Sequence, residues 1–495
     1  MASGPLPQRL RRAAPVRRPR SPRPAAPCRL PADVGALPAV PALAHVLEEL
    51  HPEIRRSFPA LERDLGGGRR TYLNSGGGTL VAQRSVEAMA HAAQYANAQD
   101  GALTAGERLT AEIHARARAD VADFLNAPSP EEVSFHLSTT HALFNLSFAF
   151  RDLLRPGDNL VITHIDHAAN VSPWESLWGE DRGLDVRQCG LRPDGTLDLA
   201  HLERLVDRRT RLVAISHASN GLGSIVPVPE VVRLARRHGR PDPPARKGRG
   251  WSGALVVVDA VHHAYHGPMD VRALRCDFLA FSGYKLFGPM IGALWGRPEW
   301  LAAVRPYRVE PNDDSAPYKF EQGTPNHACL AGLSGAIDYL RFLGERVEAG
   351  AARLPEARPL AALLERLYPA PARRRLKWAL CAILEHEKRL GRAVLEGFRA
   401  LAPRGVRLYG IADPGRVEER DPTFLFEVDA VEPEEVKRRF WEEARIEITI
   451  GSNFSVAVYR ALRKRGRVLR ASFAHYDTLE TAHRFLDMLG RIAAS

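Results

Sequence analysis

The sequence predicts an α/β protein in which a large domain is built on a mostly parallel sheet and a smaller α+β domain follows it. Three observations support this fold class. Short, continuous apolar runs alternate with helical stretches before residue 282, as expected for buried parallel strands covered on both faces. Near residue 345 the pattern changes to long helical stretches and scattered short strands. The length of 495 residues suits two domains better than one core.

The elements of the large domain follow from periodicity and turn residues. Residues 85–124 are mostly helical in pattern. Apolar runs bounded by turn residues predict strands at residues 159–163, 211–216, 254–258 and 277–282. Helices are predicted between the first three strands, at residues 197–205 and 229–237. The intervening residues 240–253 are rich in Pro, Gly and basic side chains, which predicts a surface loop.

The C-terminal part has a different set of predicted elements. Residues 354–402 are helical in pattern, with a break expected at Pro369 and Pro371. The elements predicted after them are strands at 423–428, 446–450 and 468–473 and helices at 432–444 and 478–492. We therefore expect a tail at 1–45, a segment that joins the small domain at 46–75, a large domain at 76–340 and a small domain at 341–495.

The net charge of +11 is concentrated at the start of the chain. The first 32 residues contain eight Arg and no Asp or Glu, which leaves +3 for the rest. A Pro- and Arg-rich segment of this kind predicts a disordered tail or an over-extended start site, because it cannot bury enough apolar surface to fold. Its prolines disfavour a transit peptide, and a nucleic-acid-binding arm is the alternative. The nearly neutral body disfavours nucleic acid as a partner.

Two further features bear on the compartment. We find no uninterrupted apolar run long enough to span a bilayer, so no membrane association is expected. The five cysteines are far apart and form no Cys-x-x-Cys pair, which disfavours a disulfide framework or zinc ribbon and favours a reducing compartment. We expect a cytoplasmic protein.

Polar residues follow each of the four strands predicted in the large domain. They form the runs His164-Ile-Asp-His-Ala-Ala-Asn170, His217-Ala-Ser-Asn220, Asp259-Ala-Val-His-His263 and Gly283-Tyr-Lys285. In open parallel sheets, ligands bind beyond the carboxyl ends of the strands. The sequence therefore predicts a site at this edge of the sheet.

The pair Asp259 and Lys285 indicates the chemistry of that site. Pyridoxal 5'-phosphate (PLP) needs a lysine amine for its Schiff base and a carboxylate against its pyridinium nitrogen. A phosphate cradle is predicted at Leu137-Ser-Thr-Thr-His-Ala-Leu-Phe-Asn145, where hydroxyls precede a helix start.

Metal binding is the rival interpretation of the histidine-rich runs. The possible ligands are His164, Asp166 and His167, or His262, His263 and His266. The first run is similar to part of a binuclear metallohydrolase motif whose preceding His-x-His is missing. A metal would also leave Lys285 without a purpose, so we expect none.

Five ordered blocks resemble the class V aminotransferase family, in particular its cysteine desulfurase-like proteins. The blocks are Ser138-Thr-Thr140, Val258-Asp-Ala-Val-His262, Cys276-Asp-Phe-Leu-Ala-Phe-Ser-Gly-Tyr-Lys-Leu-Phe-Gly-Pro289, Phe320-Glu-Gln-Gly-Thr-Pro325 and Leu469-Arg-Ala-Ser-Phe-Ala-His-Tyr-Asp-Thr478. The resemblance covers residues 70–345 and 446–490. It implies the type I PLP-dependent transferase fold and PLP as cofactor.

The resemblance also implies roles for individual residues. Lys285 would bind PLP and move protons, Asp259 would pair with the pyridinium and His167 would stack on the ring. Arg470 would bind the substrate carboxylate, with Asn220 near the ring oxygen or that carboxylate. The implied phosphate ligands are Thr139, Thr140 and Ser282, and Thr324 would reach the phosphate of a partner subunit, which implies a homodimer.

This chain departs from the family pattern at three places. His262 stands where Gln is common and can still donate to the phenolate oxygen. Tyr284 stands in the cofactor site where His usually precedes the lysine. Residues 450–455 read Ile-Gly-Ser-Asn-Phe-Ser, without the nucleophilic Cys of desulfurases. Without a thiolate there, sulfur cannot be taken up as a persulfide by that route.

We therefore expect a PLP-dependent enzyme that acts on an amino acid through an external aldimine, most simply a C–S lyase that works by β-elimination. An aminotransferase or an amino-acid epimerase is the alternative within the family. A non-catalytic binding protein is the alternative from another class, and the presence of Asp259, Lys285 and Arg470 argues against it.

Overall fold

The computed structural model describes residues 37–63, 66–243, 251–464 and 467–495. The tail predicted at 1–45 therefore lies largely outside the described residues, as does the middle of the loop predicted at 240–253. Residues 38–495 form one compact unit.

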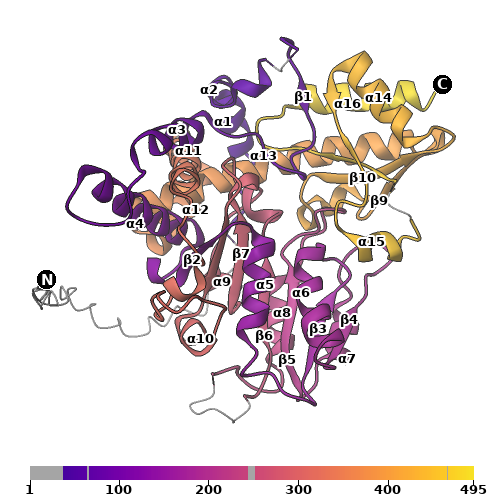
Figure 1. The fold of residues 1–495 in the computed structure, drawn as a ribbon. Coiled ribbons are helices and arrows are strands. Elements are labelled where there is room, and N and C mark those ends of the chain that lie inside the picture. The colour runs from indigo at the N-terminus through magenta and orange to yellow at the C-terminus, as the bar shows by residue number, and fades with distance from the viewer. Residues whose placement is uncertain (1–36, 64–65, 244–250, 465–466) are drawn as a thin grey trace, which may run out of the picture. The chain divides into compact units, whose positions relative to one another are not determined.

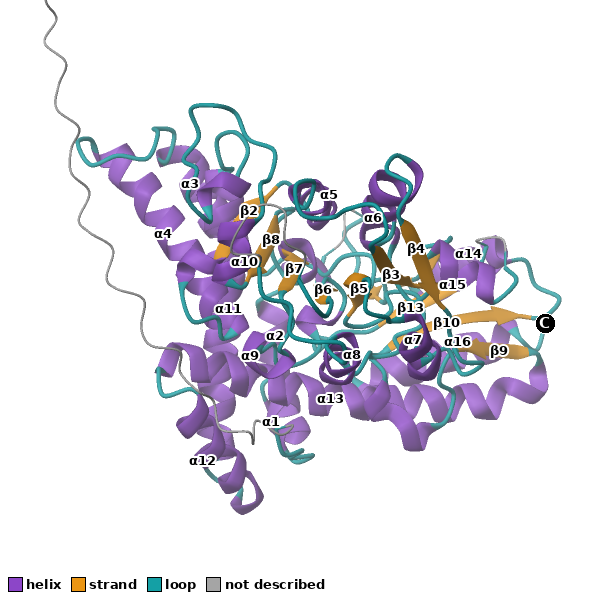
Figure 2. Ribbon diagram, turned by 90° about the horizontal axis from the view of Figure 1, so that it is seen from below, coloured by secondary structure: helices purple, strands orange, loops and turns teal. Residues whose placement is uncertain are grey.

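A seven-stranded sheet lies in the part of the chain predicted to be the large domain (Figures 1 and 2). Its strands, in spatial order, are β2 (Val133–His136), β8 (Gly292–Gly296), β7 (Phe278–Ser282), β6 (Leu255–Asp259), β5 (Thr210–Ser216), β3 (Asn159–Thr163) and β4 (Asp185–Cys189). Neighbours from β7 to β4 pair in parallel, whereas β8 runs antiparallel to both β7 and β2. The prediction of a mostly parallel sheet is confirmed.

The four predicted strands correspond to β3, β5, β6 and β7, and each boundary agrees within one residue. The three strands that were not predicted carry weaker signals. The edge strand β4 is mostly polar and only partly buried, β8 contains two glycines, and β2 has four residues. Sequence patterns as short or as mixed as these do not identify a strand by themselves.

Helices cover both faces of this sheet. Figure 2 shows α5 (Thr139–Ala149) and α6 (Ser172–Trp174) on one face and α7 (Leu199–Leu205) and α8 (Val228–Ala235) on the other. Three further helices of this part of the chain are α9 (Val271–Leu274), α10 (Pro298–Ala303) and α11 (His327–Ala351). Where the sheet faces α5, a core cluster forms from Leu160, Leu212, Val257, Phe278 and Trp300, all fully buried.

The helix predicted over residues 85–124 is in fact two helices, α3 (Gln83–Tyr95) and α4 (Ala105–Leu125). A capping box starts the second one. The backbone N–H of Glu107 donates to Thr104 Oγ1 at 3.2 Å, and the Glu107 carboxylate accepts from the backbone N–H of Thr104 at 3.0 Å. This reciprocal cap satisfies two backbone donors and therefore defines a new helix start.

The second sheet is antiparallel and has the order β12 (Thr449–Ile450), β13 (Leu469–Ser472), β10 (Thr423–Val428) and β9 (Val406–Tyr409). The short strand β1 (Thr71–Tyr72) pairs in parallel with β11 (Ile446–Glu447). The chain near residue 71 therefore lies beside the C-terminal part. The helices α14 (Pro433–Ala444) and α16 (Leu479–Ile492) pack on this sheet through Phe440 and Phe485, whose rings stack at 5.3 Å.

In the sequence, long helices separate the strands of the first sheet from those of the second sheet. The break predicted at Pro369 and Pro371 is confirmed, since α12 (Arg358–Leu367) ends before it and α13 (Pro371–Leu401) begins there. The predicted domain boundary between 340 and 341 falls inside α11, and the four-part division of the chain stays a prediction. The other helices are α1 (Leu43–Glu49), α2 (His51–Arg56) and α15 (Val456–Ala461). Among the described residues, no helix is both long and apolar enough to cross a membrane.

A buried ion pair fixes α4 against the segment after β8. Arg118 Nη1 and Nη2 donate to the two carboxylate oxygens of Glu321 at 2.8 and 2.6 Å. The same carboxylate accepts from the backbone N–H of Phe135 in β2 at 2.7 Å. Arg118 is 5% and Glu321 is 8% exposed, so removing one partner leaves a charge that water cannot solvate.

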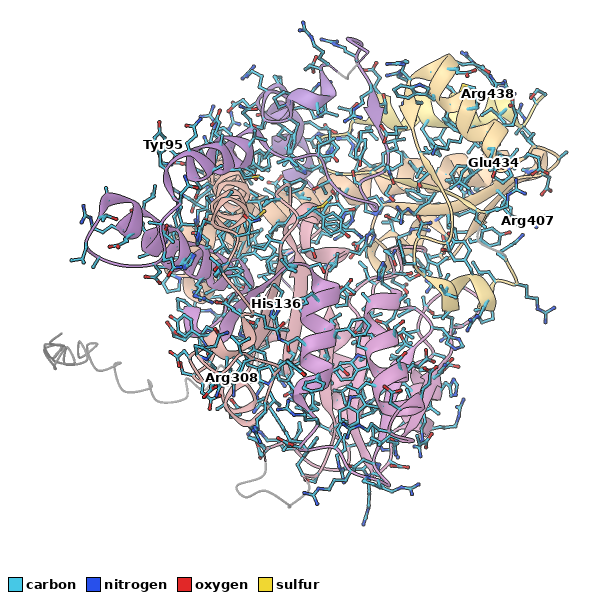
Figure 3. The ribbon with its side chains drawn as sticks, viewed as in Figure 1. Tyr95, His136, Arg308, Arg407, Glu434 and Arg438 are labelled. Atoms are coloured by element: carbon cyan, nitrogen blue, oxygen red, sulfur yellow. The ribbon has the colours of Figure 1, made fainter. Side chains whose placement is uncertain are left out.

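We predict that Arg118→Met lowers the free energy of unfolding by about 3 kcal/mol, because Glu321 then stays buried without its cation. Urea unfolding followed by circular dichroism measures this change. The matched control is Arg438→Met. Arg438 forms an exposed ion pair with Glu435 on α14, and Figure 3 labels Arg438 near Glu434. The control should leave the urea midpoint unchanged, and equal shifts in both variants would contradict the prediction.

Candidate functional site

A cavity of about 570 Å³ opens where the parallel strands end. The last residues of β5, β6 and β7 line it, namely Ser216, Asp259 and Ser282, together with residues that follow β3 and residues of β12 and β13 in the second sheet. Most of the predicted site residues lie around this one cavity, namely Thr139, Thr140, His167, Asn220, Asp259, His262, Ser282, Tyr284, Lys285 and Arg470.

Lys285 ends a single 3-10 turn, Gly283–Lys285, that directly follows β7. The side chain is 3% exposed. Burial and the positive charge of Arg470 lower its pKa to about 7, against the opposing effect of Asp259. A large fraction of this amine is therefore neutral near pH 7, and the neutral form is the nucleophilic one.

Asp259 is the last residue of β6, where it pairs in register with Ala280 of β7. One carboxylate oxygen accepts from the backbone N–H of Val261 at 3.0 Å. Burial raises the pKa of Asp259 to about 6, although that hydrogen bond and the charge of Lys285 oppose the shift. A cation held against this carboxylate would favour its ionised form.

The predicted phosphate cradle lies at the start of α5. Ser138 caps the helix by accepting from the backbone N–H of His141 at 3.1 Å. Thr139 donates its backbone N–H to Ser282 Oγ at 3.2 Å, and the two hydroxyls are 2.7 Å apart. The strand β8 approaches this turn so closely that a Cβ at Gly292 would lie 2.4 Å from the carbonyl carbon of Ser138. Only glycine fits at that contact.

Burial lowers the pKa of both histidines that line the cavity. His167 Nδ1 accepts from the backbone N–H of Ala169 at 3.0 Å, and its pKa is lowered to about 4 by burial and by the charges of Lys285 and Arg470. Burial also lowers the pKa of His262 well below its ordinary value. Among the described residues, His262 Nδ1 has no hydrogen-bond partner.

Arg470 of β13 brings the second sheet to the site. Its Nη1 donates to the backbone carbonyl of Asn220 at 2.8 Å, and its Nη2 donates to Asn74 Oδ1 at 3.3 Å. The side chain is 2% exposed, and burial lowers its pKa. Its Nε has no partner within the described part of the chain.

The side chain of Asn220 is engaged with the segment that follows β12. Its amide nitrogen donates to the carbonyl of Asn453 at 2.7 Å, and its amide oxygen accepts from Ser455 Oγ at 2.7 Å. Asn220 therefore lines the cavity while it also holds this segment in place.

Tyr284 and Thr324 complete the set of predicted site residues. Tyr284 lines the cavity and is partly buried, which raises its pKa to about 12. Thr324 is exposed and does not line the cavity. Its expected contact with a partner subunit stays a prediction.

Several lining residues were not predicted, among them Asn74, Phe144, Ser172, Thr449, Asn453 and Phe454. The signal for Asn74 was present, because Asn74-Ser-Gly-Gly-Gly78 is a polar, glycine-rich run of the type that approaches ligands closely. Phe144 carried no such signal, since an aromatic residue in a helix usually belongs to the core.

The first run of the metal alternative does not form a group of ligands. Asp166 is buried and accepts hydrogen bonds from Thr163, from Asn170 at 2.8 Å and from Ser216 at 2.8 Å. Burial raises the pKa of Asp166 to about 7. Within the described ranges, no cluster of metal-ligating atoms joins Asp166 to His164 or His167.

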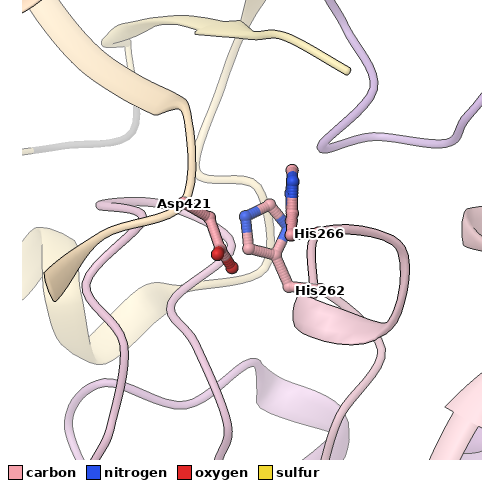
Figure 4. A group of neighbouring side chains, drawn as sticks. All are labelled: His262, His266 and Asp421. Atoms are coloured by element: carbon pink, nitrogen blue, oxygen red, sulfur yellow. The ribbon is translucent and has the colours of Figure 1, made fainter. Parts of the chain in front are cut away.

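The second run contributes to such a group. His262, His266 and Asp421 each offer an atom, and these atoms lie within 4.8 Å of one another (Figure 4). Their other contacts form a hydrogen-bonded network, in which His266 Nδ1 is 2.6 Å from Glu387 and His263 Nδ1 is 3.0 Å from Asp421. His263, the third histidine of that run, thus contacts the candidate carboxylate without joining the group itself.

Comparisons with known proteins agree with this geometry. The profile of the family described as aminotransferase class-V matches residues 71–369. The chain belongs to the class V aminotransferase family. A cysteine desulfurase of Serratia proteamaculans is 36% identical over 314 residues, which cover 59% of this chain and 72% of that protein. One of Pectobacterium atrosepticum is 35% identical over 309 residues, with the same shares covered.

Solved structures lead to the same fold. The apo structure of a cysteine desulfurase from Thermococcus onnurineus has a TM-score of 0.71 at 25% identity and covers 90% of this chain and 98% of that one. The S-sulfonic acid form of the cysteine desulfurase CsdA from Escherichia coli gives 0.68 at 25% identity, with the same shares covered. A mutant of C-DES, with glycine covalently linked to its PLP cofactor, gives 0.63 at 18% identity and covers 88% of this chain and 98% of that one.

This class V protein is a cysteine desulfurase-like, PLP-dependent enzyme with the type I fold. The cavity fits the cofactor. It contains a buried amine of lowered pKa, a carboxylate at a neighbouring strand end and, among the described atoms, unpaired nitrogens on His262 and Arg470. Its volume is within the usual range of cofactor sites.

We predict that cofactor-free protein reacts with PLP at a rate that rises through pH 7 and levels off near pH 8. The pKa of Lys285 is about 7, so its neutral amine becomes the major form as the pH passes that value. Stopped-flow measurement of the new visible absorbance gives this profile. Lys285→Ala should show no such absorbance. A rate that keeps rising to pH 10 would mean that Lys285 titrates as an ordinary lysine.

Proposed function

We propose that this enzyme is a C–S lyase that eliminates the sulfur substituent of an amino acid without storing sulfur on one of its own cysteines. The observation that carries the proposal is the composition of the cavity wall. Asn453 and Phe454 line the cavity at the place where desulfurases are expected to carry their thiol, and the wall contains no cysteine among the described residues.

The described cysteines are poor nucleophiles. Burial raises the pKa of Cys189 and of Cys381 to about 12, and it also raises the pKa of Cys276. Cys329 is partly buried with a raised pKa, and it lies in a neighbouring surface pocket beside Tyr284. Cys28 lies outside the described residues. Since the thiolate is the reactive form, none of the four described thiols is suited to accept sulfur.

The proposed roles at the cofactor follow from the positions of the side chains. When bound, PLP supplies an electron sink for the carbanion formed at the substrate Cα. Lys285 would hold the cofactor and remove the Cα proton, which suits an amine whose pKa is about 7. Asp259 would keep the ring nitrogen protonated, and His167 would lie over the ring face.

The remaining roles concern the phosphate, the phenolate and the substrate. Thr139, Thr140 and Ser282 would bind the phosphate together with the first N–H groups of α5. His262 would donate to the phenolate oxygen, and Tyr284 would lie beside the cofactor. Arg470 would bind the substrate carboxylate through its guanidinium fork, in exchange for its present contacts with Asn220 and Asn74.

We predict that L-cysteine yields hydrogen sulfide, pyruvate and ammonia in equal amounts with the uptake of one water. Sulfide, pyruvate and alanine assays on the purified protein measure this stoichiometry. Cys329→Ser is the control, and its rate should match that of the parent enzyme because no cysteine takes part. Stoichiometric alanine with protein-bound persulfide would overturn the proposal. Amino transfer to a keto acid, or loss of chirality at Cα, would instead support an aminotransferase or an epimerase.

We also propose that the enzyme works as a homodimer. Thr324 is exposed and lies outside its own chain's cavity, as expected of a residue that reaches a partner. Val81, Val86 and Met290 are 36%, 46% and 81% exposed and line one surface pocket beside Tyr284. An exposed apolar patch of this kind marks an interaction surface.

We predict that sedimentation at micromolar concentration gives twice the mass of one chain and that Met290→Asp gives a monomer, because a charge in the patch disfavours its burial. The control is Arg407→Asp, which introduces the same charge away from the patch. Arg407 belongs to β9 of the second sheet and is labelled in Figure 3. A parent protein that sediments as a monomer would refute the dimer.

A further inference from the structure

The segment from Thr449 to Ser455 is fixed against the mouth of the cavity. The carbonyl of Phe454 accepts from the backbone N–H of Ala168 at 2.8 Å, next to His167. Asn220 contacts the segment twice, through the carbonyl of Asn453 and the hydroxyl of Ser455. These bonds join the segment to two different strand ends of the large sheet, so it is a fixed wall of the site.

The backbone of this segment is strained in a way that orients one aromatic side chain. Asn453 has φ +50° and Phe454 has φ +55°, and both values lie in the left-handed region. This conformation is unfavourable for a bulky side chain such as that of Phe454. The strain is maintained by the hydrogen bonds to Ala168 and Asn220. As a result, the centroid of the Phe454 ring lies 5.4 Å from the centroid of the His167 ring, and the two ring planes are inclined by 36°.

A second aromatic residue lines the same cavity. Phe144 projects from α5, which also carries the predicted phosphate cradle. Phe144 is 47% exposed and Phe454 is 68% exposed, whereas Arg470 is 2% exposed. The cavity therefore has a cationic group in its buried part and two aromatic rings at its open part.

From this polarity we infer that the preferred substrates are cysteines whose sulfur carries an apolar, aromatic group, as in S-benzyl-L-cysteine. This inference rests on the proposed C–S lyase function. With the carboxylate at Arg470, the sulfur substituent extends to the mouth, where Phe144 and Phe454 pack against it. Burying an aromatic group there removes apolar surface of both partners from water.

The reaction on such a substrate balances without a further reagent. The Cα–H bond breaks first, with the proton taken by Lys285, and the Cβ–S bond then breaks with its electron pair leaving on sulfur. The thiolate takes up a proton and departs as an arylalkyl thiol. Water hydrolyses the remaining enamine to pyruvate and ammonia, and no oxidant or reductant is needed.

The decisive experiment compares S-benzyl-L-cysteine with S-methyl-L-cysteine in the full-length holoenzyme. We expect kcat/KM to be at least about tenfold higher for the benzyl compound. Phe454→Ala and Phe144→Ala should each remove most of that preference. Phe148→Ala is the matched control, because Phe148 belongs to the same helix, packs on Tyr307 and does not line the cavity, and it should keep the preference.

A binding measurement separates this inference from the proposed function. Calorimetry on the Lys285→Ala protein gives the ratio of the two Kd values without any turnover, and we expect the benzyl compound to bind at least about tenfold more tightly. If neither compound yields pyruvate, the lyase proposal is wrong and the Kd ratio still decides the inference. Equal Kd values, or a preference that survives in Phe454→Ala, would overturn it.

Discussion

The contact between Arg470 and the carbonyl of Asn220 is the interaction that positions the cation of the site before a substrate binds. It joins a strand of the second sheet to the loop after β5 of the large sheet, over a distance of 2.8 Å. The parallel strands alone supply an amine, a carboxylate and hydroxyls, but no cation for a substrate carboxylate. Among the described residues that line the cavity, the guanidinium cation comes from β13, and it points into the cavity because β13 is held between β10 and β12.

Burial then determines the acid–base properties of these groups. Desolvation disfavours the charged form of each, so the pKa of Lys285 falls to about 7 while those of Asp259 and Asp166 rise to about 6 and 7. Burial therefore brings the pKa values of groups that differ widely in water closer to one another. A site of this kind can hold or release a proton at several places with small changes in its surroundings.

Much of this arrangement could be predicted from the sequence, for reasons that differ between elements. The strands β3, β5, β6 and β7 are buried on both faces, so their apolar runs and the polar residues after them are visible locally. The strand β4 is an edge strand of mixed polarity, and it is recognised by its pairing with β3, which the local sequence does not show. For the same reason Phe144 and Phe454 could not be assigned to the cavity, because tertiary contacts alone bring an exposed ring to a site. The capping box at Thr104 was readable in principle, and the continuous helical pattern concealed it.

The separation of the contributing residues along the chain has a consequence for synthesis. Asn74 and Arg470 meet across 396 residues. Most of the large sheet can form while the chain is still being made, but the pocket lacks its arginine until β13 has emerged and inserted beside β10. The part of the pocket that would hold the substrate carboxylate is thus completed after the residues that would hold the cofactor. Shortened translation products that stop before β13 would present an open, apolar sheet edge to the chaperones of the cell.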